Sequence, residues 1–190
     1  MKKVQRNELL PLGDYEHVRE RFRGRVIAEK KTRRLTLSED VSILFESHDT
    51  VLLQIQEMLR TERITQERAL LHELETYNGT LPDGPGLAAT LYIEIPDRAR
   101  RDEMLERLCA IEEHVVLDLG AVKVRATFEE GRRDKNRAAA VQYLQFPFDA
   151  EAIAALRTAK EAALVVDHPA LAARLALPAT TVAVLRDDLE

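Results

Sequence analysis

No helix or central strand can pass through residues 78–86. Their sequence, NGTLPDGPG, has glycine or proline at five of nine positions, and both residues interrupt regular secondary structure. The segment therefore separates a mainly helical half with a β-hairpin, residues 1–80, from an α/β half, residues 87–190. We expect the halves to form one compact unit, because 190 residues correspond to about 1.3 domains of ordinary size.

Apolar spacing predicts helices and one hairpin in the N-terminal half. In order, the expected elements are a helix from Asp14 to about Lys30, a hairpin of strands 34–37 and 41–45, a helix from Asp49 or Thr50, and a helix from Thr65. Few residues join the last two helices, which predicts an antiparallel pair.

Strands and helices alternate after the break and predict an α+β fold. In order, we expect a strand at 87–95, a helix at 97–113, strands at 115–119, 122–128 and 141–148, a helix from Asp149, a strand at 163–166, and one or two terminal helices. This half would hold a mixed sheet of about four or five strands with flanking helices, and Tyr143, Phe146 and Phe148 are interpreted as core residues. Residues 170–189 have the apolar spacing of a helix-turn-helix, but Asp187 and Asp188 would repel phosphate.

Composition and charge exclude several protein classes. The chain has 28 basic and 33 acidic residues, a net charge of −5, which argues against a surface built to grip nucleic acid or anionic membrane. No apolar run is long enough to span a bilayer. The lone Cys109 cannot form an internal disulfide. We therefore expect a cytoplasmic protein with no membrane span.

Sequence patterns of common enzymes do not occur in the chain. It has no phosphate-binding GxxxxGK[ST], no HExxH and no GxSxG, so the usual nucleotide, zinc-protease and serine-hydrolase sites are excluded. No Glu-x-x-His is present either, which argues against a di-iron helical bundle. The sequence patterns therefore identify no catalytic residue, metal or cofactor.

Polar residues gather around a predicted helix at 49–61. On that helix, Gln56, Arg60 and Arg63 share one strip, and Gln54, Glu57 and Thr61 share another. The candidate site comprises Glu46, His48, Asp49, Gln54, Glu57, Arg60, Glu62 and Arg63, together with Asp167 and His168 at the end of a later strand. Two interpretations stay open: a metal or polar-ligand site formed by Glu46, His48, Glu57 and Glu62, or salt bridges, such as Glu57 with Arg60, that set how the helices pack.

A basic stripe runs along residues 19–34. Eight cationic residues stand there against Glu20 and Glu29, a local charge of +6. The candidate binding residues are Arg19, Arg23, Lys30, Lys31, Arg33 and Arg34. Such a stripe can hold phosphates or an acidic partner, or it can be a solvated helix face. A second patch comprises Arg132, Arg133, Lys135 and Arg137.

Residues 45–64 also carry a family resemblance. Asp49-Thr50, Gln54, Gln56-Glu57-Met58, Arg60 and Glu62-Arg63-Ile64 stand in an order that resembles a bacterial family known only as domain of unknown function 3501. Weaker similarities follow at Tyr77-Asn78, Ala89-Thr90-Leu91, Glu94, Tyr143 to Phe146 and Asp167-His168-Pro169, whereas Ser47-His48 replace an expected Asn-Arg. The resemblance implies no activity. It implies a rubrerythrin-like or iron–sulfur oxidoreductase as partner.

The sequence thus favours a non-catalytic accessory or protein-interaction module that forms a homodimer and has the charged helix as its functional surface. The resemblance implies that it works in a bacterial redox or oxidative-stress system. One alternative is a small metal-binding protein or enzyme with a carboxylate and histidine site. A third is a phosphate or nucleic-acid binder that uses the basic stripe, although the net charge and acidic tail argue against nucleic acid.

Overall fold

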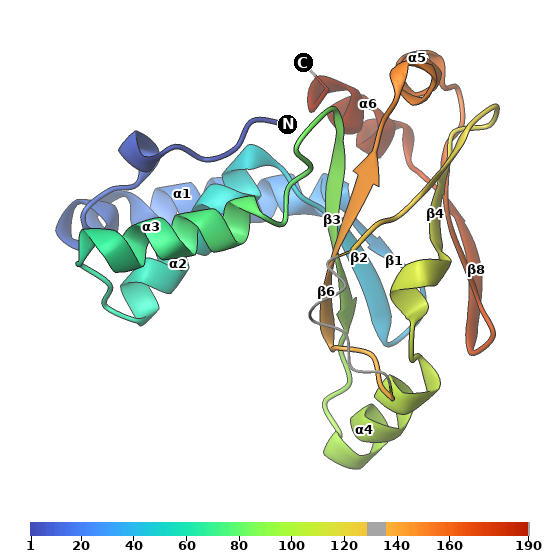
Figure 1. Ribbon diagram of the computed structural model, residues 1–190, viewed down its shortest axis with the longest axis horizontal. Coiled ribbons are helices and arrows are strands. Elements are labelled where there is room, and N and C mark those ends of the chain that lie inside the picture. The colour runs from blue at the N-terminus through green and yellow to red at the C-terminus, as the bar shows by residue number, and fades with distance from the viewer. Residues whose placement is uncertain (129–135, 190) are drawn as a thin grey trace.

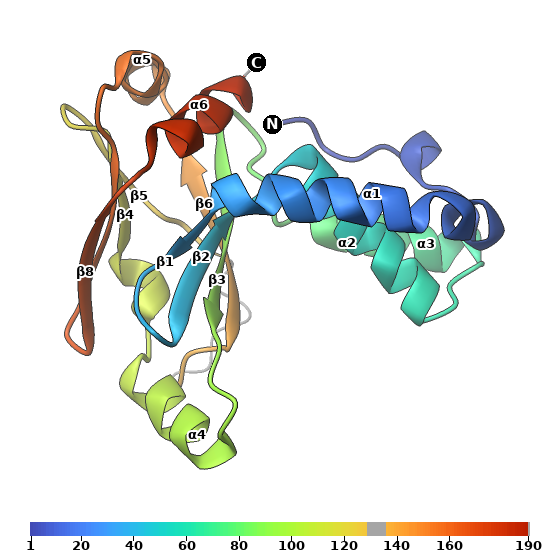
Figure 2. The same cartoon turned by 180° about the vertical axis from the view of Figure 1, so that it is seen from behind.

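Three helices form an arm that projects from one side of the molecule (Figures 1 and 2). The computed structural model describes residues 1–128 and 136–189. The arm consists of α1 (Leu12–Arg33), α2 (His48–Thr61) and α3 (Glu67–Asn78), preceded by the short 3-10 helix η1 (Arg6–Glu8). Helix α2 lies between the other two and contacts both. Each helix begins within two residues of its predicted start.

The described strands form two four-stranded antiparallel sheets, which we name sheets A and B. Sheet A has the order β1-β2-β3-β6 and sheet B the order β5-β4-β7-β8. Their strands are β1 (Arg34–Thr36), β2 (Val41–Phe45), β3 (Gly86–Ile93), β6 (Val141–Pro147), β5 (Lys123–Arg125), β4 (Val115–Asp118), β7 (Ala163–His168) and β8 (Leu171–Ala176). Pro147 ends β6 on the edge of sheet A, where a missing N–H donor is tolerated.

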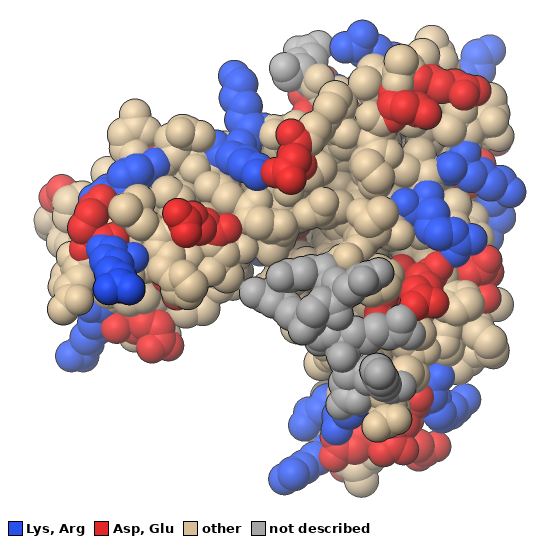
Figure 3. All heavy atoms as spheres, viewed as in Figure 1, with Lys and Arg blue, Asp and Glu red and all other residues tan. Residues whose placement is uncertain are grey.

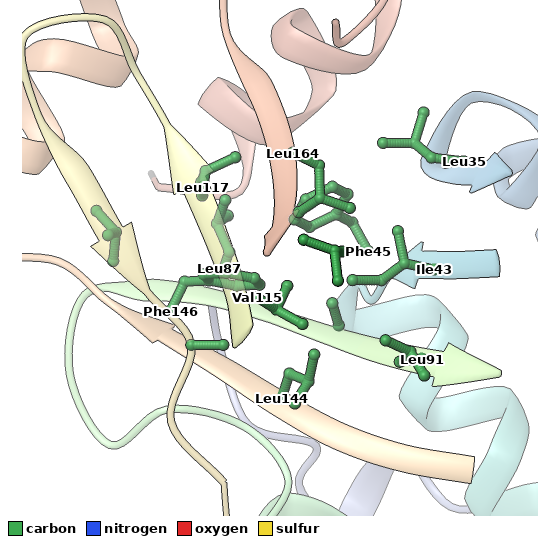
Figure 4. Close-up of a cluster of buried hydrophobic side chains, with 14 of the residues drawn as sticks. Leu35, Ile43, Phe45, Leu87, Leu91, Val115, Leu117, Leu144, Phe146 and Leu164 are labelled. Atoms are coloured by element: carbon green, nitrogen blue, oxygen red, sulfur yellow. The ribbon is translucent and has the colours of Figure 1, made fainter. Parts of the chain in front are cut away.

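The main apolar core lies where the two sheets face each other (Figure 4). Every second residue of β3 points into this core, including the fully buried Leu87 and Leu91, because side chains alternate across a strand. The rings of Phe45 and Phe146 meet there with their centroids 6.0 Å apart. Three helices and the 3-10 helix η2 (Ile111–His114) add apolar side chains at the margins of the core: α4 (Arg98–Arg107), α5 (Ala150–Thr158) and α6 (Ala179–Asp187).

The predicted α+β class is confirmed, but the strands are arranged differently from the single mixed sheet that we expected. The hairpin of the N-terminal half pairs with β3 of the C-terminal half, with Val41 opposite Ile93 and Phe45 opposite Ala89. One sheet therefore spans the glycine- and proline-rich break. The remaining strands form sheet B, and all pairs described are antiparallel.

The apolar spacing of the tail, which resembles that of a helix-turn-helix, does not give two helices. Residues 171–176 form β8, which pairs with β7, and only α6 follows. Side chains at Leu171, Ala173 and Leu175 are half-buried while those between them are exposed, so the segment has the period of a strand. The helix predicted at 97–113 also ends early, at Arg107, and η2 follows.

The longest described helix, α1, has 22 residues and is rich in charge. None of the helices within residues 1–128 and 136–189 combines the length and apolar character needed to cross a bilayer.

Candidate functional site

Glu57 on α2 is bonded to α1. Its carboxylate accepts a hydrogen bond from the Tyr15 hydroxyl at 2.6 Å and two from Arg19, at 2.8 and 2.9 Å. Hydrogen bonds from Arg19 and Tyr15 lower the pKa of Glu57 to about 2, although burial acts in the opposite direction. Burial and the contact with Glu57 raise the pKa of Tyr15. The predicted pairing of Glu57 with Arg60 is therefore wrong, since the partner is Arg19.

The other charged side chains of α2 also turn toward neighbouring segments. Arg60 donates to Glu16 at 2.5 Å, and Asp49 lies 2.7 Å from Arg25. The His48 Nε2 atom lies 3.1 Å from Glu8. Glu62 and Arg63 follow the helix and are exposed. Salt bridges to α1 therefore engage Asp49, Glu57 and Arg60.

Asp167 and His168 lie on sheet B and do not join the residues of α2. Asp167 is 3.0 Å from the Nδ1 atom of His114. His168 is buried, and its Nδ1 atom accepts a hydrogen bond from the Ala170 N–H at 3.1 Å. Its Nε2 atom must then carry the proton that bonds the Cys109 carbonyl at 3.0 Å. These bonds fix the turn between β7 and β8.

The predicted metal ligands do not converge. Glu46 contacts Thr50 and Thr90, His48 contacts Glu8, Glu57 contacts Arg19, and Glu62 is exposed. In the described part of the chain, no three histidine, cysteine, aspartate or glutamate side chains are grouped as metal ligands would be.

The basic stripe is partly paired. Arg33 is buried and bonds Asp188 at 2.6 and 2.8 Å, which corrects its prediction as a surface binding residue. Arg34 donates to Glu94 at 2.5 Å. Arg23 and Lys31 are exposed, and Lys30 is half-buried. In the second patch, Arg137 bonds Asp102 at 3.0 Å, while Arg132, Arg133 and Lys135 lie outside the described residues.

A pocket of about 370 Å³ lies on the face of sheet A that turns away from the core. It lies where the helical arm meets sheet A (Figure 1). The space-filling view shows a hollow between the arm and the end of the molecule that carries α4 (Figure 3). Its lining comes from α1, the connection between β2 and α2, α2, α3 with the loop after it, β3 and β6: Lys30, Glu46, Val51, Gln54, Met58, Tyr77, Thr80, Thr90, Tyr92, Val141 and Tyr143. We name it the tyrosine pocket.

Glu46 is the charged group that the local sequence holds most firmly in this pocket. Its N–H donates to the Ala88 carbonyl at 2.8 Å, which continues the pairing of β2 with β3. Ser47 then caps α2 in a capping box with Thr50, instead of the predicted Asp49 or Thr50. The Thr50 hydroxyl donates to one carboxylate oxygen of Glu46, and the Thr90 hydroxyl donates to the other at 2.5 Å.

Tyr92 forms a neutral aromatic wall beside Glu46. Burial, together with the negative charge of Glu46, raises the pKa of Tyr92 to about 12. The guanidinium carbon of Arg34 stands 5.0 Å from the centre of its ring, within the range of a cation–π contact. At neutral pH the phenol is therefore protonated and can donate a hydrogen bond.

The sequence predictions found Glu46, Gln54 and Lys30 but missed the strand residues of the pocket. Thr90 and Tyr92 alternate along β3 with the core residues Ala89 and Leu91. That alternation was visible in the sequence, but which face would meet the arm was not. Tyr143, interpreted as core, is half-buried and lines the pocket, whereas Phe146 and Phe148 are core residues.

The chain is similar to a solved structure and to a protein family. No curated protein matches the chain significantly. A crystal structure of a novel protein of unknown function from Burkholderia pseudomallei is similar to it, with 32% sequence identity, full coverage of both chains and a TM-score of 0.92. A family model described as "Protein of unknown function (DUF3501)" matches residues 3–189. The chain belongs to this family.

Proposed function

We propose that this protein is a non-catalytic accessory module of the cytoplasm that works by binding, and that the tyrosine pocket is its binding site. One observation carries the proposal: side chains from both the helical arm and sheet A converge on one concave site of about 370 Å³. Small-molecule sites measure about 300–1,000 Å³ and combine apolar walls with a few fixed polar groups.

The chemistry of the lining suits binding. Three tyrosines supply aromatic surface with hydroxyl groups, while Gln54 and Thr80 can donate and accept hydrogen bonds. Glu46 is fixed in place by two threonine hydroxyls, so little entropy is lost when a ligand contacts it.

Fragment screening by ¹H–¹⁵N NMR tests the proposal. We expect fragments to shift the amide signals of Thr90, Tyr92 and Tyr143 in a saturable way. Gln54→Trp should abolish these shifts, because position 54 is exposed and borders the pocket. His72→Trp, exposed on α3 outside the pocket, is the matched control and should keep them. Fragments that bind elsewhere, or none at all, would refute the proposal.

The family resemblance adds a second prediction, that the module serves a rubrerythrin-like or iron–sulfur oxidoreductase. Arg63 supports an electrostatic contact, since it is exposed beside Arg60 on the arm. Surface plasmon resonance with a purified rubrerythrin-like protein should show binding that weakens in the Arg60→Ala, Arg63→Ala double variant. Arg68→Ala, exposed at the start of α3, should leave it unchanged. If the unmodified protein, the double variant and Arg68→Ala bound the partner equally, Arg60 and Arg63 would be excluded as its binding surface.

A further inference from the structure

We propose that the tyrosine pocket recognises an organic cation, a primary ammonium or guanidinium group, and that Glu46 is its counter-ion. This inference rests on the proposed function and names the chemical class of its ligand.

Glu46 differs in what holds it from four carboxylates of the fold that pair with an arginine. These pairs are Glu57 with Arg19, Asp49 with Arg25, Asp188 with Arg33, and Asp118 with Arg174. The Glu46 carboxylate accepts only hydroxyl hydrogen bonds from Thr50 and Thr90, and among the described residues no ion pair reaches it. A carboxylate withdrawn from water gains most from a cation that can reach it.

The walls of the pocket favour a cation as well. Tyr77, Tyr92 and Tyr143 line it together with Glu46, and the face of an aromatic ring attracts positive charge. Arg34 already uses the ring of Tyr92 in this way. Because the Tyr92 phenol stays protonated, Glu46 supplies the negative charge beside it.

The charge of Lys30 should affect cationic and anionic ligands in opposite directions. It lines the same pocket and forms no ion pair within residues 1–128 and 136–189. Its ammonium group would repel a cationic ligand, and its flexible stem allows it to move aside. Removing this charge should therefore strengthen the binding of a cation and weaken that of an anion.

Three probes of similar shape and different charge test the inference: benzylamine, benzyl alcohol and phenylacetate, titrated at pH 7 and followed by ¹H–¹⁵N NMR. We expect benzylamine to shift the signals of Thr90, Tyr92 and Tyr143 with a Kd of about 1 mM, as suits a fragment of this size. Benzyl alcohol should bind at least about tenfold more weakly, since its hydroxyl can donate to Glu46 but carries no positive charge to pair with the carboxylate. Phenylacetate binding as tight as that of benzylamine would overturn the inference.

Variants identify the counter-ion. Glu46→Gln keeps one acceptor oxygen for a threonine hydroxyl, and its NH2 group can donate to the other hydroxyl. The variant should weaken benzylamine binding about tenfold or more, because the negative charge is lost. Glu94→Gln is the matched control, because Glu94 lies just beyond β3, already bonds Arg34 and does not line the pocket. It should bind benzylamine like the unmodified protein. Unchanged binding by Glu46→Gln would refute Glu46 as the counter-ion.

Lys30→Met keeps the inference testable if Glu46→Gln fails to fold. Its benzylamine affinity should rise severalfold, and a fall would overturn the inference. The same titrations distinguish failure of this inference from failure of the proposed function. If no fragment of any charge binds the pocket, the proposed function is refuted. If neutral or anionic fragments bind there in preference to benzylamine, the proposed function stands and only the cation preference is refuted.

Discussion

Glu57 is a carboxylate that is 29% exposed and accepts three hydrogen bonds from α1. Its neighbours give it a structural role, because Tyr15 is fully buried and needs an acceptor for its hydroxyl. Glu46 stands at the other extreme, since hydroxyl groups bond its carboxylate and no arginine within the described part of the chain does. Two glutamates eleven positions apart thus differ through their partners alone.

We expect Glu57→Gln to lower the free energy of unfolding at pH 7 by about 2 kcal/mol, after allowance for solvent screening. The pKa of Glu57 in the folded protein, about 2, lies below the ordinary glutamate value of 4.5. The contribution is therefore complete above the unfolded pKa and is lost as pH falls toward 2. Urea denaturation of both proteins from pH 7 to pH 2.5 measures it.

Glu16→Gln is the control for that experiment. Glu16 bonds Arg60, but its side chain is 49% exposed, so its loss should cost less than about 1 kcal/mol. A difference between Glu57→Gln and the unmodified protein that stays constant with pH would contradict the assignment of the shift to Glu57.

At the scale of elements, two glycines differ in whether the fold has room for a side chain in their place. Gly24 lies inside α1, and a Cβ there would meet nothing within 4 Å. Gly86 opens β3 opposite Pro147, and a Cβ there would stand 2.5 Å from the carbonyl oxygen of Phe146. The first glycine weakens a helix, while the second permits close contact between two strands.

We expect Gly24→Ala to stabilise the protein by about 0.5–1 kcal/mol, because alanine has the higher helix propensity and fits without contact. Gly86→Ala should destabilise it by about 2 kcal/mol or more, since backbone must move. Thermal unfolding followed by circular dichroism compares both variants. If Gly86→Ala left the stability unchanged, β6 would be able to move away from the added Cβ.

At the scale of the whole molecule, a buried ion pair joins distant parts of the chain. Arg33 at the end of α1 bonds Asp188, which follows α6, and its Nε atom lies 2.8 Å from Glu29. Burial alone would lower the pKa of Arg33, but the bonds to Asp188 and Glu29 outweigh burial and raise it. The Thr181 hydroxyl adds a hydrogen bond to the Thr32 carbonyl at 2.7 Å. These contacts fix the base of the arm against the C-terminal helix.

We expect Asp188→Asn to destabilise the fold by about 3 kcal/mol, because it leaves the Arg33 charge buried with a weaker partner. Glu94→Gln removes the exposed bond to Arg34 instead and should cost less than about 1 kcal/mol. Guanidinium denaturation compares the two variants, and equal losses would contradict the distinction between buried and exposed pairs.

The predicted homodimer also belongs to this scale. Two-fold dimers are the commonest closed assembly of soluble chains, and we expect native mass spectrometry to give twice the chain mass of 21.6 kDa. A spectrum of single chains at micromolar concentration would contradict this prediction.

The sequence by itself determined the α+β class, most element positions and the family, because apolar periodicity and turn residues act over a few neighbouring positions. It also identified Glu46, Gln54 and Lys30 as candidates. Only the tertiary structure decided that the hairpin 34–45 joins β3, that Arg33 is buried, and that Thr90, Tyr92 and Tyr143 line one pocket with Glu46. Strand pairing and ion pairing join residues far apart in the chain, and local pattern contains no information about which distant partner a residue meets.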